Sequence, residues 1–245
     1  MQLIHQPHRA DFARSRVGRP WHDVAMCGRF AIDDSVDELV RAFVAEGGDW
    51  ADALTALPNP EIRPTDTIAV LLESAKGADG PRRILAPARW SLVPSWSRTL
   101  KTSGPTFNAR VETVGEKATW KGPLAKRRCV IPASSYAEWR GDRGAKTRFD
   151  IANPEGELML FAGLAQWWRP SESAPWLLTA TMITRPALGT LAEIHDRMPM
   201  VLPPGLVDDW IDSQRSGDQA FADAIAAASI EAGLQLRAVE ATPAA

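Results

Sequence analysis

Hydrophobic and polar residues alternate in short runs through the middle of the chain, whereas helical spacing is confined to its two ends. The runs are separated by Gly, Pro, Asp and Asn, a pattern typical of strands joined by turns. The predicted strands are Thr67–Leu72, Arg83–Val93, Arg128–Ile131, Thr147–Ile151, Glu157–Leu164, Trp176–Ile183 and Met200–Leu202.

Helices are predicted near the two ends of the chain. A capping box at Ser35 to Glu38 opens the first helix, which ends at Gly47-Gly48. Pro203-Pro204 can open a second helix that runs through Ile211. Asp218 can cap a third, which Gly233 ends. The segments 58–64 and 140–146 are expected to be loops.

The order of these elements bears on the fold class. Because strands do not alternate regularly with helices, a parallel, doubly wound sheet is disfavoured. We expect a single α+β domain with a curled, mostly antiparallel β-sheet flanked by helices.

Composition narrows the class of protein. With 45% hydrophobic and 24% charged residues, the 245-residue chain is typical of a soluble globular protein. No apolar run approaches the ~18 residues of a membrane-spanning helix, so we expect no membrane association. Cys27 and Cys129 offer no disulfide framework, which favours the reducing cytoplasm, and no CxxC or HxxxH spacing indicates a metal site. We therefore expect no metal and no cofactor.

Charge and hydropathy set residues 1–25 apart. They contain four arginines against two aspartates, but they lack the ~7–15-residue apolar core of a secretory signal. Three interpretations stay open for this extension: translated sequence upstream of a misplaced start, a leader that is removed, or a retained tail. The remaining residues are net negative, so binding to nucleic acid would require a local basic cleft.

Four short segments combine reactive or binding side chains in a way that a plain core does not require. Each residue also has a simple structural interpretation. A lone cysteine is usually a small buried hydrophobe, an asparagine can be a turn residue, and arginines are commonly solvated. The segments are Met26 to Phe30, Phe107 to Thr113, Ala137 to Trp139 and Ile194 to Pro199.

Together these segments resemble the SOS-response-associated peptidase (SRAP) family, the abasic-site processing proteins. The resemblance runs from Met26 to about Trp210, and its strongest matches, in order, are MCGRF, FNARVET, RRCVIPASSYAEW and IHDRMPMVL. It implies an SRAP-like domain over residues 26–240 that forms a covalent crosslink to abasic sites in single-stranded DNA and protects the lesion during the DNA damage response. It also implies that an initiator methionine is removed, which leaves Cys27 as the first residue.

The resemblance further assigns roles to individual positions. The family's asparagine, glutamate and histidine match Asn108, Glu138 and His195, so the implied catalytic set is Cys27, Asn108, Glu138 and His195. Its DNA-contacting arginines match Arg29, Arg110 and Arg197. We add Trp96, which lies in a Pro/Ser context ahead of Asn108 and is suited to stack on a base.

These residue types suit the implied chemistry. An abasic sugar opens to an aldehyde, and only a cysteine with a free α-amine can condense with it and close a five-membered thiazolidine ring. The amine and the thiol have ordinary pKa values near ~8 and ~8.5, so part of each is deprotonated near neutral pH. Glu138 is expected to move protons at the amine, His195 to open the sugar, and Asn108 to orient the amine.

Two other functions remain open from the sequence. Cys27 and His195 could form the pair of a thiol peptidase acting on other proteins. Autoproteolysis of the bond between Met26 and Cys27, in contrast, belongs to the favoured function, because it would expose the Cys27 amine. Alternatively, the arginines could make a non-catalytic single-stranded-DNA-binding module. The favoured interpretation is a cytoplasmic monomer, associated with the nucleoid when bound to DNA, whose partner is single-stranded DNA containing abasic sites.

Overall fold

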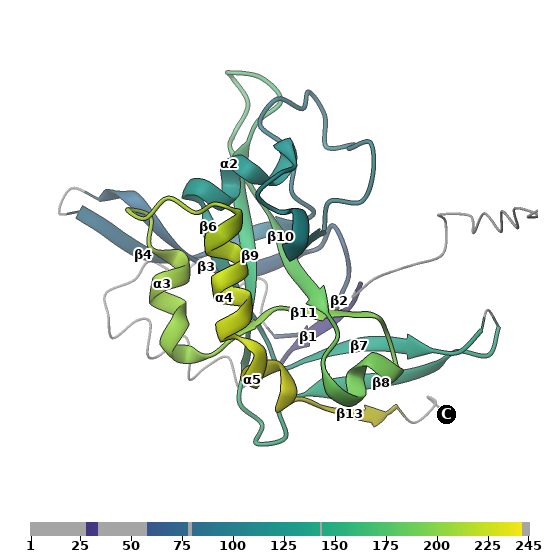
Figure 1. Ribbon diagram of the computed structural model, residues 1–245. Coiled ribbons are helices and arrows are strands. Elements are labelled where there is room, and N and C mark those ends of the chain that lie inside the picture. Colours follow the sequence, from purple (N-terminus) through teal and green to yellow (C-terminus); the bar gives the residue numbers. More distant parts are fainter. Residues whose placement is uncertain (1–27, 34–57, 78–79, 143, 242–245) are drawn as a thin grey trace, which may run out of the picture.

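The computed structural model describes residues 28–33, 58–77, 80–142 and 144–241, in which two β-sheets pack together and helices cover parts of their surface (Figure 1). In these ranges the smaller sheet has five strands, and every pairing in it is antiparallel. In spatial order its strands are β13 (Arg237–Glu240), β8 (Thr147–Ala152), β7 (Ser135–Arg140), β1 (Phe30–Ile32) and β2 (Asn59–Ile62).

The larger sheet is strongly curled. Strand β10 pairs with β4 on one edge and with β9 on the other, so β10, β4, β3, β6 and β9 close into a ring. The pairings of β10 with β4 and β5 are parallel, and the other described pairings are antiparallel. Its strands are β11 (Arg197–Pro199), β10 (Leu177–Pro186), β4 (Gly80–Trp90), β3 (Thr67–Gly77), β6 (Arg128–Ala133), β9 (Met159–Trp168), β12 (Val201–Leu202) and β5 (Asn108–Arg110).

The described helices are short, and several contact the larger sheet. Helix α2 (Ala118–Lys126) contacts β9 and β6, and α3 (Val207–Ile211) contacts β6. The buried Arg128 ties these two helices together, because its guanidinium donates to the carbonyls of Leu124 and Trp210. The remaining helical segments are η2 (Val111–Thr113), η3 (Gly189–Glu193), η4 (Pro204–Leu206), α4 (Gln219–Ala228) and α5 (Ile230–Leu234).

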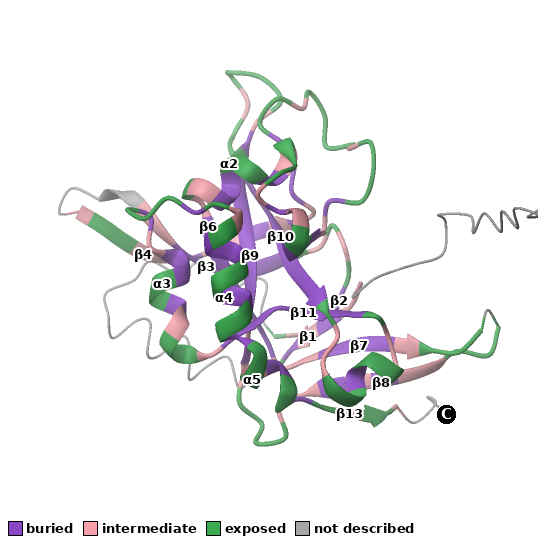
Figure 2. Cartoon of the chain, viewed as in Figure 1, coloured by how far each residue is buried: buried purple, intermediate pink, exposed green. Residues whose placement is uncertain are grey.

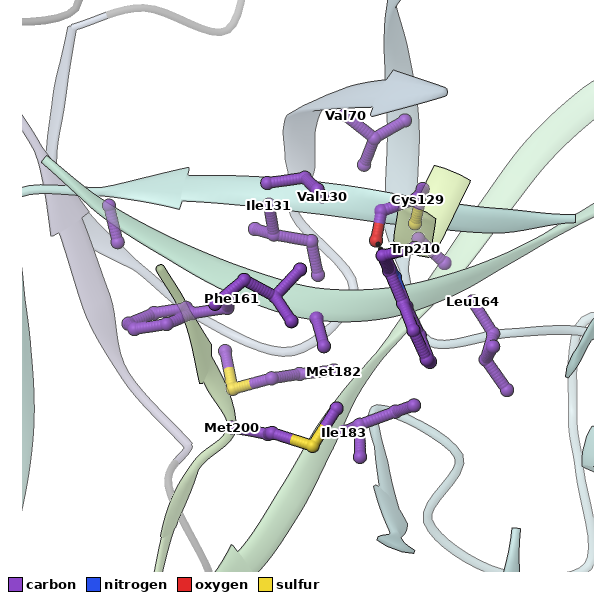
Figure 3. Packing of buried hydrophobic residues seen from close by; sticks show 14 of the residues in the cluster. Val70, Cys129, Val130, Ile131, Phe161, Leu164, Met182, Ile183, Met200 and Trp210 are labelled. Carbon is purple, nitrogen blue, oxygen red and sulfur yellow. Dashed lines mark hydrogen bonds between the residues drawn. The ribbon is translucent and has the colours of Figure 1, made fainter. Parts of the chain in front are cut away.

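The hydrophobic core lies inside the ring of strands and extends to the smaller sheet. Figure 3 shows Phe161 and Met182 among the aliphatic side chains of this core, with Trp210 at its side. Strands β9 and β10 are buried along most of their length (Figure 2). Phe30 and Tyr136 from the smaller sheet both meet Phe161, with ring centroids 6.2 and 6.0 Å apart. These contacts lock the two sheets together.

The expectation of an α+β domain with a curled, mostly antiparallel sheet is confirmed. Each predicted strand overlaps an observed one, and the Asp218 cap is present, since its carboxylate accepts from the Phe221 backbone N–H at 2.8 Å. The predicted third helix divides into α4 and α5 at Ser229, whose hydroxyl donates to the Ile225 carbonyl and competes with the helical hydrogen bonds.

One predicted loop is partly a strand. Residues 59–62 form β2 at the edge of the smaller sheet, a position that tolerates Pro60 because an edge strand can lack one N–H donor. The helix predicted from Ser35 to Gly48 and the extension over residues 1–25 lie outside the described residues.

Candidate functional site around strand β10

Strand β10 brings together two of the four sequence segments. On one edge it pairs with β5, with Met182 opposite Asn108 and Thr184 opposite Arg110. On the other edge it pairs with β11, with Pro186 opposite Arg197. Because paired residues and alternate residues of a strand share a face, Asn108, Arg110 and Arg197 lie on the same face of the sheet.

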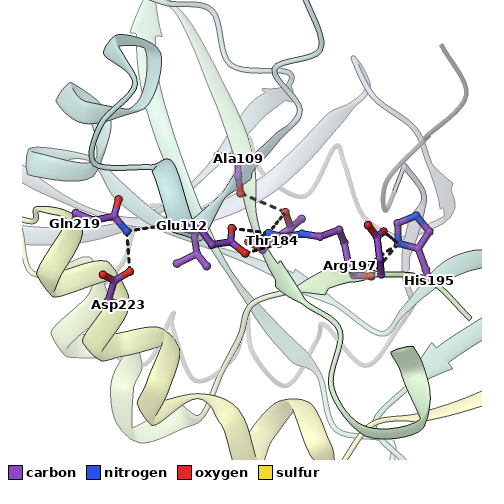
Figure 4. A network of polar contacts seen from close by, with 9 residues as sticks. Ala109, Glu112, Thr184, His195, Arg197, Gln219 and Asp223 are labelled. Atoms are coloured by element: carbon purple, nitrogen blue, oxygen red, sulfur yellow. Dashed lines mark hydrogen bonds and ion pairs between the residues drawn. The ribbon is translucent and has the colours of Figure 1, made fainter. Parts of the chain in front are cut away.

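A bidentate ion pair connects η2, which follows β5, to β11 across β10. The Arg197 guanidinium donates to both carboxylate oxygens of Glu112, at 2.5 and 3.0 Å, and to the Thr184 carbonyl at 2.7 Å (Figure 4). The Arg197 side chain is only 8% exposed, whereas that of Glu112 is 44% exposed. A planar fork of this kind fixes geometry as well as charge. A phosphate that contacts Arg197 would have to compete with Glu112 for the guanidinium.

The electrostatics around Glu112 are dominated by arginines. Burial by itself would raise the pKa of Glu112, but the hydrogen bonds from Arg197 and its own backbone, together with the charges of Arg197 and Arg110, hold the pKa below its usual value. Arg185 is also nearby: burial lowers its pKa, Arg197 adds to that effect and Glu112 opposes it. The charges of Arg110, Arg185 and Arg197 all interact with that of Glu112. Of these arginines, Arg110 is exposed.

His195 lies just before β11, where η3 ends, and its side chain is 14% exposed. Its ring Nδ1 lies 3.0 Å from the backbone N–H of Arg197 and 3.2 Å from a carboxylate oxygen of Asp196. When Nδ1 carries no proton, it can accept from that N–H; when it is protonated, it can donate to Asp196. Nδ1 of His195 therefore has both a possible donor and a possible acceptor beside it.

Glu138 is buried in β7 and only 2% exposed, which is rare for a glutamate. In the alternating pattern of the strand it shares a face with Tyr136, whose ring packs against Phe161 of the larger sheet. The Glu138 side chain is therefore on the interior face of the smaller sheet.

Backbone and aromatic contacts join the first segment to two of the others. The Ala137 N–H donates to the Arg29 carbonyl at 3.0 Å, which couples β1 to the strand of Glu138. Phe30 packs against Trp90 with centroids 5.0 Å apart, and the Trp90 indole donates to the Phe107 carbonyl at 2.9 Å. The chain before Phe30 is thus fastened both to the Glu138 strand and to the residue that precedes Asn108.

Arg29 is on the outer face of the smaller sheet, opposite to Phe30. It donates to Glu61 at 2.8 Å, and its guanidinium lies 5.0 Å from the centre of the Trp139 ring. The hydrogen bond from Arg63 chiefly lowers the pKa of Glu61, and Arg29 contributes its charge. Cys27 lies outside the described residues and is bonded to Gly28, the first of them.

Trp96 is 62% exposed in the connection between β4 and β5. Hydrogen bonds fix the chain on both sides of Trp96. Trp168 donates its indole N–H to the Ser97 carbonyl at 2.8 Å, and the Val93 N–H donates to the Thr179 hydroxyl at 3.0 Å. The exposed face of Trp96 is therefore carried by an anchored segment.

The second cysteine is buried. Cys129 lies in β6 with 0% exposure, and burial raises the pKa of its thiol, so it is a poor nucleophile in the folded protein. In the described ranges, no group of His, Cys, Asp and Glu side chains could hold a metal ion. No helix among the described elements is long and apolar enough to cross a membrane.

Two residues that sequence reasoning left without a role stand at the centre of this arrangement. Glu112 belongs to the FNARVET segment, two positions after Arg110, and this spacing is the sequence feature that could have indicated a role for it. Thr184 gave no signal in the sequence, because its carbonyl and hydroxyl become important only when β5 and β11 meet on either side of β10.

Known proteins are similar to this chain in sequence and in fold. A family model described as SOS response associated peptidase (SRAP) matches residues 26–242. The abasic site processing protein YoqW of Bacillus subtilis (strain 168) is 32% identical over 192 residues, which cover 78% of this chain and 82% of that protein. The abasic site processing protein HMCES of Pongo abelii is 32% identical over 228 residues, covering 76% of this chain and 64% of that protein.

Solved structures show the same architecture. A protein from Bacteroides thetaiotaomicron superposes with a TM-score of 0.70 at 18% identity, over 89% of this chain and 93% of that one. A protein from Bordetella bronchiseptica gives a TM-score of 0.68 at 22% identity, over 88% and 100%. At these identities the likeness concerns the fold alone. The family model and the relatives, which match most of the chain, establish that this protein belongs to the SOS response associated peptidase (SRAP) family.

Proposed function

We propose that this protein captures abasic sites in single-stranded DNA by forming a thiazolidine crosslink through Cys27 as the first residue of the mature chain. The relatives bear the name abasic site processing protein. The observation that carries the proposal is the convergence on β10, which places Asn108, Arg110 and the segment of His195 around one strand. The segment that leads back to Cys27 is fastened to the same region through Phe30 and Trp90.

The proposed reaction proceeds in two bond-forming steps. The Cys27 amine adds to the sugar aldehyde, and the carbinolamine loses water to give an imine. The thiol sulfur then adds to the imine carbon, its proton passes to the nitrogen, and the five-membered ring closes. No oxidant or reductant is needed.

Three side chains serve these steps. His195 passes a proton to the ring oxygen as the closed sugar opens to the aldehyde, helped by its alternative partners at Nδ1. Glu138 takes the proton from the amine and returns one to the departing hydroxyl, and Asn108 orients the nitrogen. General acid–base groups of this kind contribute about 10²–10⁴ in rate.

The DNA strand is held by positive charge and by stacking. The exposed Arg110 is well placed to bind a phosphate beside the lesion, while Arg197 adds positive charge and holds β11 to η2 through Glu112. Trp96 offers an exposed face to a neighbouring base. Arg29 lies on the outer face beside Trp139 and contacts the DNA strand as that strand leaves the site. The protein acts in the cytoplasm as a monomer and needs no cofactor.

Exposure of the Cys27 amine is the condition for this chemistry. We propose that the bond between Met26 and Cys27 is cut by the protein itself, with Cys27 attacking the Met26 carbonyl and water releasing residues 1–26. Intact mass spectrometry of the purified protein tests this step, since loss of residues 1–26 leaves a chain that starts at Cys27.

A denaturing gel tests the capture itself. We expect a protein–DNA band that survives denaturation with an abasic oligonucleotide and is absent with an intact one. Cys27→Ala should abolish the band, and Cys27→Ser should leave at most a labile adduct, while Cys129→Ala serves as the matched control and should crosslink normally. An undiminished band with Cys27→Ala would refute the assignment.

Other outcomes would support the alternative functions. Salt-sensitive binding of all single strands without a denaturation-resistant band would indicate a non-catalytic binding module. Repeated turnover of a peptide substrate would indicate a general thiol peptidase.

A further inference from the structure

A second group of exposed aromatic residues lies at the end of β9 and in the connection between β9 and β10, away from Asn108 in β5. Trp167 is 41% exposed and Trp176 is 57% exposed, although β9 is otherwise almost wholly buried. Exposed apolar residues that gather in one patch often mark a binding site. Trp168 between them is different, because it is buried and its indole is used to hold the Trp96 segment.

Both exposed rings line two adjacent hollows of about 480 and 570 Å³, which share Arg127, Trp167 and Trp176. The larger hollow continues toward Ile84 of β4 and Ser213. We call this surface the Trp167–Trp176 groove. Its size and flat aromatic walls suit planar ring systems.

The cations of the groove favour an anionic occupant. Arg127 lines both hollows and donates to the Gln166 amide oxygen at 2.8 Å. Lys126 also lines the groove, and the Arg169 guanidinium lies 4.4 Å from the centre of the Trp176 ring. Two acidic residues also line the groove, Glu73 in the larger hollow and Glu172 in the smaller one. Glu73 is bound by the N–H and hydroxyl of Ser213.

We propose that the Trp167–Trp176 groove binds a segment of single-stranded nucleic acid several nucleotides away from the abasic site, with bases stacked on the tryptophans and a phosphate at Arg127. This proposal rests on the proposed function, because it extends the same bound strand. Exposed aromatic rings interleaved with cations are the usual platform for single strands without sequence preference. The groove is also linked to the Trp96 segment, because the Trp168 indole donates to the Ser97 carbonyl. In Figure 1 the β4–β5 connection and the β9–β10 connection lie at the same end of the molecule.

The length of β10 gives the distance between Asn108 and the Trp167–Trp176 groove. Trp176 directly precedes β10 and lies six positions before Met182, which pairs with Asn108. At ~3.3 Å per residue this span is about 20 Å. A stacked single strand advances ~3.4 Å per nucleotide, so about six nucleotides are needed to reach from the lesion to the groove. Shorter strands should not contact it.

The experiment compares strand lengths and aromatic content. Fluorescence anisotropy would measure the affinity for single strands that contain tetrahydrofuran, a stable abasic analogue. For each side of the analogue in turn, the strand carries either roughly two or roughly ten nucleotides. For the double variant Trp167→Ala/Trp176→Ala we expect the long strand on one side to bind about fivefold more weakly or worse, and the short strand to bind as in wild type. The double variant with phenylalanine at both positions should retain most of the affinity.

Ile230→Ala is the matched control, because Ile230 is 41% exposed like Trp167 but lies on α5. Unchanged binding of the long strand, or an equal loss with short and long strands, would overturn the proposal. Crosslinking of a short abasic strand by the alanine variant shows that the variant folds and that the first site works. If wild type fails to crosslink any abasic strand yet shows the length-dependent effect, the proposed function fails and the groove stands.

Discussion

Glutamine in place of Glu112 is the perturbation that best separates geometry from charge at the candidate site. The substitution keeps the size of the side chain but replaces two hydrogen bonds between opposite charges by at most one hydrogen bond from the Arg197 guanidinium to a neutral amide oxygen. Arg197 keeps the Thr184 carbonyl as an acceptor at 2.7 Å, so its charge does not become wholly uncompensated. The link between η2 and β11 across β10 is weakened without a cavity.

The size of the expected change in the free energy of unfolding follows from the exposure of Glu112 and Arg197. A hydrogen bond to a charged group contributes about 1.5–3 kcal/mol when buried. Because the Glu112 side chain is 44% exposed, screening by water reduces the total to about 1–2 kcal/mol. We therefore expect the free energy of unfolding to fall by about that amount, with a decrease in Tm of about 2–4 °C per kcal/mol for a chain of this size.

The effect should depend on pH in a defined direction. The pKa of Glu112 in the folded protein lies below its ordinary value of 4.5, so its contribution to stability is fully present above that value and is lost as the pH falls through the folded pKa. The difference between wild type and Glu112→Gln should be constant around neutral pH and should shrink in the acid range below 4.5.

Urea denaturation followed by circular dichroism over a pH series measures this difference. Glu116→Gln, an exposed carboxylate in the same connection, is the matched control and should change stability by less than about 0.5 kcal/mol. The rate of crosslinking should fall with Glu112→Gln and not with Glu116→Gln. A stability difference that is the same at every pH, or no difference near neutrality, would refute the role of the ion pair.

Three further predictions concern other parts of the molecule. Glu138→Gln should slow both capture of the abasic site and removal of residues 1–26, with the circular dichroism spectrum retained; wild-type rates in single-turnover crosslinking and mass spectrometry would remove Glu138 from the mechanism. Cys129 should react with thiol reagents only after unfolding, because it is buried and its thiol pKa is raised, and rapid labelling of the native protein would contradict this. Asp218→Ala should lower the free energy of unfolding by about 1 kcal/mol through loss of the α4 cap, measured by urea denaturation, with Asp223→Ala on the exposed part of the same helix as a comparison. An equal effect of the two aspartate substitutions would mean that capping is not the cause.

Local sequence patterns predicted the regular elements wherever short-range preferences agree with the fold. The strands of the ring and the Asp218 cap follow from alternation and capping chemistry, which operate over a few residues. Helix α2 gave no such signal, because Gly122 and Pro123 interrupt it and its apolar residues do not form a clear stripe. Its helical form is supported by burial of Trp120 and Leu124.

The sequence by itself identified the candidate residues for the chemistry, because the four segments hold reactive side chain types at fixed spacing along the chain. Only the tertiary structure decided how those residues meet. The pairing of β10 with β5 and β11 places Asn108 and Arg110 beside Arg197, and the same pairing buries Arg197 against Glu112 while Arg29 lies on an outer face. Strand pairing joins residues that are far apart in the chain and is selected by burial of the whole core, so neither local preference nor spacing in the sequence contains it.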